Sequence, residues 1–183
     1  MMSPEEQKIL RNLKDENSKN RAFNDLVNLY KQRLYWHIRK IVISHDDADD
    51  VLQNTFLKVW KSIDNFRSEA GLYTWLYRIA TNEALSFLKQ KQKRSILPLN
   101  DVSEYLVETL KAENHFSGDE IQQKFQEAII RLPEKQRLVF NMKYYDDIKY
   151  QDMSKILDTS EGALKASYHH AVKKIEEFMR NQA

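Results

Sequence analysis

The sequence predicts an all-α protein: two small helical domains (an N-terminal helical bundle and a C-terminal helix-turn-helix bundle) joined by a flexible acidic linker. Three observations support this prediction. The 183 residues include only three Gly and three Pro, so long stretches contain no residue that breaks a helix. Apolar residues recur every three or four positions through the first half of the chain and again after Ile121. Between these stretches, residues 95–120 show little sustained periodicity and contain two of the breakers.

Four amphipathic helices are expected in the first domain, residues 1–94, and four helices in about 90 residues suggest a compact bundle. The first helix opens on Ser3, which can cap it, followed by Pro4 at its first position. The third begins with four Asp in its first turns, where the helix dipole favours negative charge. The expected ranges are 3–14, 20–43, 45–63 and 70–93.

Charge is distributed unevenly along the chain. Residues 1–94 hold 17 Lys/Arg against 12 Asp/Glu, residues 95–123 hold one Lys against six acids, and residues 124–183 hold 11 against 9. Two basic blocks therefore flank an acidic segment, and an anionic polymer could be held at both ends of the chain. The linker, residues 95–120, is expected to be flexible with at most one short helix. Its acids Glu104, Glu108 and Glu113 would keep it away from a nucleic acid.

The second domain, residues 121–183, contains the pattern of a helix-turn-helix. Four helices are expected, at 121–132, 133–145, 150–157 and 160–179. In the third, Met153 and Leu157 face inward, and the turn Asp158–Ser160 follows. Ser160 can cap the last helix. The apolar or small residues at core spacing in that helix are Ala163, Leu164, Tyr168 and Ala171.

The opposite face of the last helix presents short polar and basic side chains. Such a helix fits the major groove of B-DNA and can reach base edges and phosphates. A helical packing unit with no ligand is the alternative interpretation of the same spacing. The residues on the outer face or its flanks, with the cap, are Ser160, Glu161, Lys165, Ser167, His169 and Lys173.

The segment 132–157, LPEKQRLVFNMKYYDDIKYQDMSKIL, followed by SEGALK, resembles the C-terminal DNA-binding domain of bacterial RNA polymerase sigma factors of the extracytoplasmic-function (ECF) class. DADDVLQNTFLKVWKSI is similar to the helix with which this family binds core RNA polymerase, and FRSEAGLYTWLYRIATNEALSFLKQKQKR is similar to its promoter-melting and minus-ten-reading segment. The resemblance covers roughly residues 20–94 and 121–180, in the order of the family.

The resemblance implies that the helix at 45–63 binds the coiled-coil clamp of RNA polymerase. Its Asp46 and Asp47 are ordinary residues of a helix N-terminus, and Trp60 could serve equally as a core residue or as an interface anchor. The residues that the resemblance assigns to the polymerase-binding surface are Asp50, Gln53, Asn54, Leu57 and Trp60.

The stretch EAGLYTWLYRIATN, residues 69–82, suggests a surface for single-stranded DNA. Trp75 lies at core spacing from Leu72 and Ile79, which turns Tyr73, Tyr77 and Arg78 toward other faces. Rings can stack on exposed bases while cations hold phosphates. The polar loop before this helix could hold a flipped base, although burial of all three aromatic rings remains the alternative. The minus-ten residues implied in this way are Asn65, Phe66, Arg67, Tyr73, Tyr77 and Arg78, with phosphate contacts from Lys89, Lys91, Lys93 and Arg94.

Some positions depart from the family pattern. Asp158 stands where a turn glycine is common, and Asp tolerates left-handed geometry. Ser167 and His170 replace residues that are often basic, so binding of the minus-thirty-five element by the isolated second domain should be weak and sensitive to salt. Ser86 replaces a frequent Asp in the melting helix.

Other classes of function find little support. The absence of Cys excludes disulfides and thiolate zinc sites, and no catalytic motif is present. His169 and His170 point about 100° apart on a helix, so no metal or other cofactor is expected. No apolar run approaches the ~20 residues that span a bilayer, and no secretory signal is found. We therefore expect a cytoplasmic protein that is not an enzyme.

The sequence thus predicts a sigma factor that binds core RNA polymerase and promoter DNA, reads the minus-thirty-five duplex with its second domain, and reads and melts the minus-ten element with its first. The resemblance also implies control by an anti-sigma factor. One alternative is a helix-turn-helix regulator that does not itself initiate transcription. Another is a helical adaptor that binds only proteins. Nothing in the residues identifies the promoter sequence, the anti-sigma factor or the inducing signal.

Overall fold

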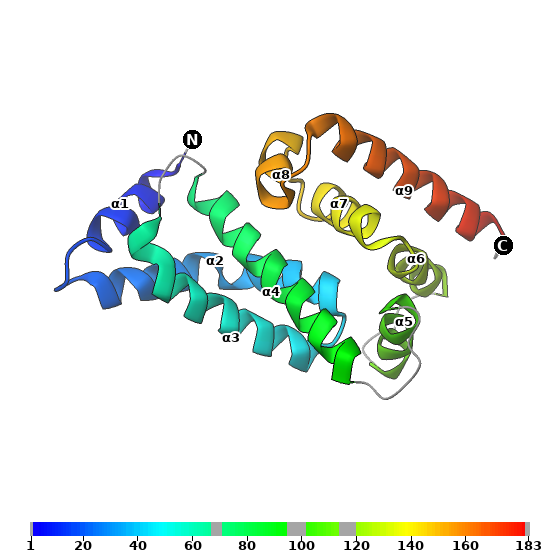
Figure 1. Cartoon of the computed structure of the whole chain (residues 1–183), viewed down its shortest axis with the longest axis horizontal. Coiled ribbons are helices and arrows are strands. Elements are labelled where there is room, and N and C mark those ends of the chain that lie inside the picture. The colour runs from blue at the N-terminus through cyan, green and yellow to red at the C-terminus, as the bar shows by residue number, and fades with distance from the viewer. Residues whose placement is uncertain (1, 67–70, 95–101, 114–119, 182–183) are drawn as a thin grey trace.

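The computed structural model describes residues 2–66, 71–94, 102–113 and 120–181, in which every regular element is a helix. The first helical unit consists of α1 (Pro4–Asn12), α2 (Lys19–Val42), α3 (His45–Ser62), the short 3-10 helix η1 (Ile63–Asn65) and α4 (Leu72–Arg94). The second consists of α6 (Glu120–Ile130), α7 (Glu134–Tyr144), α8 (Tyr150–Leu157) and α9 (Glu161–Asn181). The helix α5 (Val102–Ala112) lies between them in the chain (Figure 1). The all-α prediction is confirmed.

The caps predicted for the first unit are present. The Ser3 hydroxyl accepts a hydrogen bond from the Glu6 amide at 3.2 Å, and the Glu6 carboxylate accepts one from the Ser3 amide. This reciprocal capping box satisfies donors that the first turn of a helix leaves unpaired. Ser44 caps α3 in a similar way through the Asp47 amide, which supports the interpretation of Asp46 and Asp47 as residues of a helix N-terminus.

The core of the first unit lies where α2, α3 and α4 pack against one another. The apolar residues that recur along α2 form a buried stripe, from Leu26 through Leu34 and Ile38 to Ile41. Ala48, Val51 and Val59 of α3 and Leu72, Leu76 and Ala80 of α4 complete it. Because apolar burial is the main favourable term in folding, this three-helix contact fixes the directions in which the outer faces of α3 and α4 point.

The second unit has a smaller core, in which α7 packs against α9 and α6 against α9. Its buried residues include Phe140, Ala171 and Ile175. Arg137 is buried as well, and its guanidinium donates to the Ile130 carbonyl at 2.9 Å. This bond satisfies an orphan carbonyl at the end of α6 and holds α7 against it.

The two units are in contact. Helix α4 packs against α8, and α2 packs against α7. Figure 1 shows α4 running between α3 on one side and the second unit on the other. One continuous cluster of buried side chains extends from Leu76 of α4 to Met153 and Leu164 of the second unit.

The predicted linker contains the one short helix that was expected there, α5. Ser103, Leu106 and Val107 of this helix are buried. Glu113, one of the three linker acids named from the sequence, binds Arg39 and accepts a hydrogen bond from the His45 amide at 2.7 Å. Two donors at the α2–α3 junction therefore hold the end of the described part of the linker against the first unit.

Candidate functional site

Helix α3 presents a continuous exposed face. The residues that face inward are Ala48, Val51, Thr55 and Val59. The five residues assigned to polymerase binding, Asp50, Gln53, Asn54, Leu57 and Trp60, are all exposed. Their spacing of three or four positions places them along one side of the helix. This face combines carboxylate and amide groups with two large apolar side chains, a composition suited to a protein partner.

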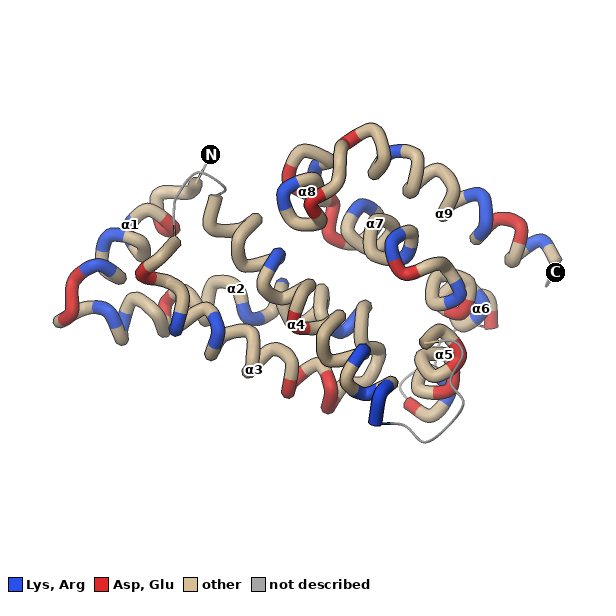
Figure 2. Tube along the Cα trace, viewed as in Figure 1, with Lys and Arg blue, Asp and Glu red and all other residues tan. Residues whose placement is uncertain are grey.

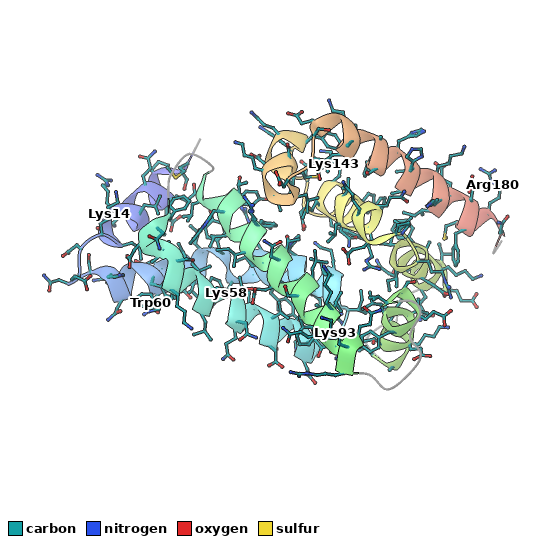
Figure 3. The ribbon with its side chains drawn as sticks, viewed as in Figure 1. Lys14, Lys58, Trp60, Lys93, Lys143 and Arg180 are labelled. Atoms are coloured by element: carbon teal, nitrogen blue, oxygen red, sulfur yellow. The ribbon has the colours of Figure 1, made fainter. Side chains whose placement is uncertain are left out.

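Leu57 and Trp60 are the apolar part of that face. Leu57 is 54% exposed and Trp60 is 36% exposed. The Trp60 ring meets the edge of Phe23 at 4.8 Å between centroids, and the Lys19 ammonium lies 5.5 Å from the ring centroid. One side of the indole therefore packs on α2 and the other remains accessible, at the side of the first unit away from α8 and α9 (Figure 3). Trp60 therefore packs partly as a core residue and is partly available as an interface anchor, the two roles between which the sequence did not decide.

The aromatic residues at the start of α4 lie differently from the prediction. Tyr77 is 3% exposed, and its ring lies 4.4 Å from that of Tyr73 and 4.8 Å from that of His37. The expectation that Tyr77 faces outward was therefore wrong for this arrangement, because the face of α4 that carries it is covered by α2 and the second unit. Trp75 is half-buried against Phe66, with 5.0 Å between centroids.

Burial changes the acid–base behaviour of this tyrosine pair. Loss of water around the phenols raises the pKa of Tyr73 to about 12 and raises that of Tyr77 further. A phenol is protonated near neutral pH even at its ordinary pKa of about 10, and these shifts keep both hydroxyls protonated in alkaline solution as well. The pair carries no negative charge that would repel a nucleic-acid strand.

Replacing Tyr77 by alanine should lower the free energy of unfolding by about 3 kcal/mol or more, because it removes a buried aromatic ring. Tyr77→Phe keeps the ring and should cost about 1 kcal/mol. Urea unfolding followed by circular dichroism measures both. Equal stabilities of Tyr77→Ala and the parent protein would contradict the burial of this ring. Tyr77→Ala is consequently a poor probe of DNA contact, because it removes packing first.

The remaining residues assigned to the minus-ten element form a smaller surface than predicted. Asn65 and Arg78 are exposed, and Phe66 and Tyr73 are half-buried. Arg67 lies outside the described residues. The surface that α4 and the preceding turn offer to a strand therefore consists of amide, guanidinium and partly exposed rings.

The basic last turns of α4 are divided between two roles. Lys89, Lys93 and Arg94 are exposed and can meet phosphates. Lys91 instead binds the Asp47 carboxylate and lies 5.3 Å from the ring centroid of Tyr105 in α5. Partial burial opposes the charge of Lys91, but the hydrogen bonds and charge interactions with Asp47 and Tyr105 together outweigh it and raise the pKa of Lys91. Lys91 thus joins α4 to α3 and α5, and Figure 2 shows this basic end of α4 close to α5.

The predicted helix-turn-helix is present as α8, a three-residue turn and α9. Asp158 ends α8 in the left-handed conformation, with φ of +48°, as the departure from glycine at this position predicted. The Ser160 hydroxyl accepts from the Ala163 amide at 3.4 Å and begins α9. Met153 and Leu164 are fully buried between the two helices. Their packing fixes the angle at which α9 leaves the turn.

The outer face of α9 is accessible. Ser160, Glu161, Lys165 and His169 are exposed, whereas Ser167 is half-buried. Ala163, predicted to be a core residue, is exposed because Leu164 takes the inward position. Gly162, Ala163 and Ala166 thus form a strip of small exposed residues between the polar ones. The prediction missed this strip, which allows the helix backbone to approach a groove closely.

The turn at Asp158 allows a direct test of backbone strain. Asp158→Val should lower the free energy of unfolding by about 1–2 kcal/mol relative to Asp158→Gly, because a β-branched residue is strained at positive φ and glycine is not. Chemical unfolding of the two variants measures the difference. A valine variant as stable as the glycine variant would show that the turn is not left-handed.

Three further residues, which the prediction did not assign to any function, lie where the two units meet. His37 of α2 is buried between Asp146 and Thr81, and Lys40 also binds Asp146. A cleft of about 690 Å³ opens beside them, lined in part by Arg33, Trp36 and Tyr145. A polar residue on the apolar stripe of α2, between Leu34 and Ile41, was the one signal in the sequence that pointed to His37.

Within the described residues, no group of three or more His, Cys, Asp or Glu side chains is placed to hold a metal ion. The His169 and His170 rings are 5.9 Å apart and both residues are exposed. None of the helices in the described ranges is both long and apolar enough to cross a membrane.

Comparison with known families agrees with this geometry. Residues 26–94, which contain α3 and α4, match the model of sigma-70 region 2, and residues 122–175, which contain the helix-turn-helix, match that of sigma-70 region 4. The ECF RNA polymerase sigma-E factor of Haemophilus influenzae is 31% identical over 164 residues, covering 85% of this chain and 86% of that protein. The ECF RNA polymerase sigma factor SigW of Bacillus subtilis is 27% identical over 168 residues, covering 87% and 90%.

Two solved structures share the fold. CnrH, solved in complex with the cytosolic domain of CnrY, has a TM-score of 0.71 at 19% identity and covers 98% of this chain and 99% of its own. The sigma factor RpoE of Bartonella quintana, solved with the anti-sigma factor NepR, has a TM-score of 0.65 at 23% identity and covers 86% and 96%.

Proposed function

The chain belongs to the ECF class of RNA polymerase sigma factors, and we propose that it binds core RNA polymerase and directs it to specific promoters. In this proposal the first domain, residues 1–94, docks on core enzyme and reads and melts the minus-ten element. The second domain, residues 121–183, reads the minus-thirty-five duplex, and residues 95–120 join the two. The protein supplies recognition and strand opening in the cytoplasm, and the polymerase performs the chemistry of RNA synthesis.

The observation that supports this proposal most strongly is the exposed face of α3. All five residues that the family resemblance assigns to polymerase binding lie on it, and two of them, Leu57 and Trp60, are large exposed apolar residues one helical turn apart. The exposed outer face of α9 supports the DNA-reading part of the proposal.

The proposed reading of the minus-ten element depends on trapping an opened strand. Opening a duplex costs pairing and stacking, so bases must gain new partners when they leave the helix. Stacking on an aromatic side chain contributes about 1–3 kcal/mol per base. Phe66 and Tyr73 are the partly exposed rings near Asn65 and Arg78 that can offer such partners.

Transcription in vitro tests the function. Transcript starts mapped after overexpression supply promoter fragments, and purified core RNA polymerase is then assayed on them with and without this protein. We expect promoter-specific transcripts only when both are present. DNA binding without transcripts would support a regulator that does not initiate, and binding to polymerase without any effect on start sites would support a helical adaptor.

We also propose that an anti-sigma factor controls this protein. The support comes from the family and from the two solved relatives, one of which was captured with an anti-sigma factor. A protein that binds the purified chain and abolishes the transcripts described above would meet this expectation. An anti-sigma factor that binds without reducing them would contradict it.

A further inference from the structure

The Trp60 indole on the α3 face is in contact with two residues at the start of α2. Helices α2 and α3 run antiparallel, so the beginning of one lies beside the end of the other (Figure 1). Phe23 lies 4.8 Å from Trp60 between ring centroids, with 71° between the ring planes. The Lys19 ammonium lies 5.5 Å from the centroid of the indole. An aromatic ring and a cation, both from α2, therefore flank Trp60.

A second contact keeps the Lys19 ammonium near the indole. The ammonium binds the Asp64 carboxylate of η1 at 2.9 Å, and the Lys19 side chain is only 17% exposed. Because η1 follows α3 directly, Asp64 and Trp60 reach Lys19 from the same end of that helix. Lys19 thus joins the start of α2 to the end of α3 by a charge-assisted hydrogen bond and a cation–π contact.

Both α2 residues lie outside the part of the chain that matches the family model. The match to sigma-70 region 2 begins at residue 26, after Lys19 and Phe23. Neither residue was assigned to polymerase binding from the sequence. Their relation to the α3 face becomes visible only where the two helices pack together.

Contacts of this kind matter for a side chain that a partner must accommodate. An exposed tryptophan on a helix can adopt more than one rotamer, whereas a pocket on a partner accepts one orientation of the ring. A side chain already held in that orientation loses less conformational freedom on binding, and this strengthens the complex. Perpendicular ring packing and a cation near the ring each favour particular orientations of the indole.

We propose that Lys19 and Phe23 are positioning residues of the polymerase-binding surface, which hold the Trp60 indole in the orientation that core RNA polymerase accommodates. The surface then extends from α3 onto the start of α2 and depends on residues before the matched region. This inference rests on the proposed docking of the α3 face, whereas the orientation of Trp60 is a property of the free chain.

The first experiment observes the Trp60 indole in the free chain. The protein is labelled with 5-fluorotryptophan, and the fluorine resonances are assigned by Trp36→Phe, Trp60→Phe and Trp75→Phe. Lys19→Met, which keeps an unbranched chain without the charge, and Phe23→Leu should each increase the nanosecond motion of the Trp60 ring in fluorine relaxation. The motion of Trp36 and Trp75 should stay as in the parent. Unchanged motion of Trp60 in both variants would overturn the proposal.

The second experiment measures the affinity for core RNA polymerase in the absence of promoter DNA. Because the sequence has no Cys, a dye can be attached through Asn181→Cys at the exposed end of α9. Unlabelled variants then compete with this labelled chain for limiting core enzyme. Lys19→Met and Phe23→Leu should each raise the dissociation constant by roughly three- to tenfold, and Trp60→Ala should raise it by roughly tenfold or more.

A double-mutant cycle distinguishes positioning of Trp60 from direct contact with polymerase. In the Trp60→Ala background there is no indole to hold, so Lys19→Met and Phe23→Leu should each change the dissociation constant by less than about twofold. Losses of equal size with and without the indole would show that the two residues act independently of Trp60, which contradicts the positioning role.

Lys31→Met and Phe87→Leu are the matched controls. Lys31 is exposed on the same helix as Lys19, and its ammonium bonds Asn28. Phe87 is a half-buried ring of the first unit that also has a lysine ammonium 5.5 Å from its centroid. Both controls should leave the affinity within about twofold of the parent, and circular dichroism verifies that every variant is folded. A control that weakens binding as much as its counterpart would refute a specific role.

The outcomes separate this inference from the proposed function. If Trp60→Ala weakens binding while Lys19→Met and Phe23→Leu do not, the positioning role is wrong and docking through α3 stands. If neither Trp60→Ala nor Leu57→Glu weakens binding, the α3 face is not the docking surface, and the role proposed for its two positioning residues is wrong as well.

Discussion

Replacing Leu57 by glutamate should lower promoter-specific transcription with core RNA polymerase by roughly 30-fold or more, while leaving the stability of the chain within about 0.5 kcal/mol of the parent. Leu57 is 54% exposed at the centre of the α3 face, so its side chain packs little within the chain. A central apolar anchor typically contributes about 2 kcal/mol or more to a protein interface. Burying an unpaired carboxylate there adds a further penalty.

Ile121→Glu is the control for this substitution. Ile121 is an exposed aliphatic residue of similar size, 62% exposed, at the start of α6 and away from the α3 face. It receives the same charge but should retain transcription within a factor of about two. Transcription is measured over a range of core polymerase concentrations. Weaker binding is overcome at high polymerase concentration, whereas a loss of activity in the bound complex is not. Full activity of Leu57→Glu at limiting polymerase would show that α3 is not the docking helix.

Lys165→Glu should weaken binding of the minus-thirty-five duplex by about 10- to 100-fold at 0.15 M salt and reduce the salt dependence of that binding. Lys165 is exposed on the outer face of α9, next to the small residues Ala163 and Ala166 that allow close approach. Reversing its charge removes one attraction to phosphate and introduces one repulsion. Transcription from promoters with a matched minus-thirty-five element should fall in parallel.

Lys174→Glu provides the matched comparison on the same helix. Nine positions at ~100° each place Lys174 about half a turn from Lys165, on the opposite side of α9. Lys174 is exposed, as Lys165 is. The two substitutions change the net charge of the protein by the same amount. We expect at most a few-fold effect. Equal losses for the two variants would indicate an effect of overall charge and contradict a specific DNA-facing side.

The elements that the sequence predicted well are those set by local chemistry. Ser3 and Pro4 begin α1 as expected, and Asp158 adopts the left-handed conformation that its side chain tolerates. The stripe of α2 from Leu26 to Ile41 is buried because apolar residues that recur at helical spacing leave little choice of inward face. Capping, turn geometry and periodicity act within a few residues of sequence, so they can be read without knowledge of the tertiary structure.

Helix α4 shows where local reading fails. It packs against α2 and α3 on one side and against α8 on the other, so it has two buried faces instead of one stripe. The sequence placed Tyr77 on another face because Leu72, Trp75 and Ile79 already formed one inward face at core spacing. Tyr77 is buried by contacts with His37 of α2 and with Tyr73, and periodicity within one helix cannot reveal contacts made by another helix.

The polar contacts between distant parts of the chain also could not be predicted from the sequence. Asp146 binds His37 from 109 positions away, and Glu113 binds Arg39 from 74 positions away. In the sequence these carboxylates resemble any solvated acid of a loop. Only the packing of α7 and α8 on α2 and α4 brings them to donors in a buried place.

The central claim is that this chain, with core RNA polymerase, opens promoter DNA. Permanganate oxidises unpaired thymines, so it reports strand separation directly at a mapped start site. We predict reactive thymines just upstream of the start only when core enzyme and this protein are both present, and fewer with Leu57→Glu or Lys165→Glu. Thymines that stay unreactive in a complex that is bound at the promoter would contradict the account.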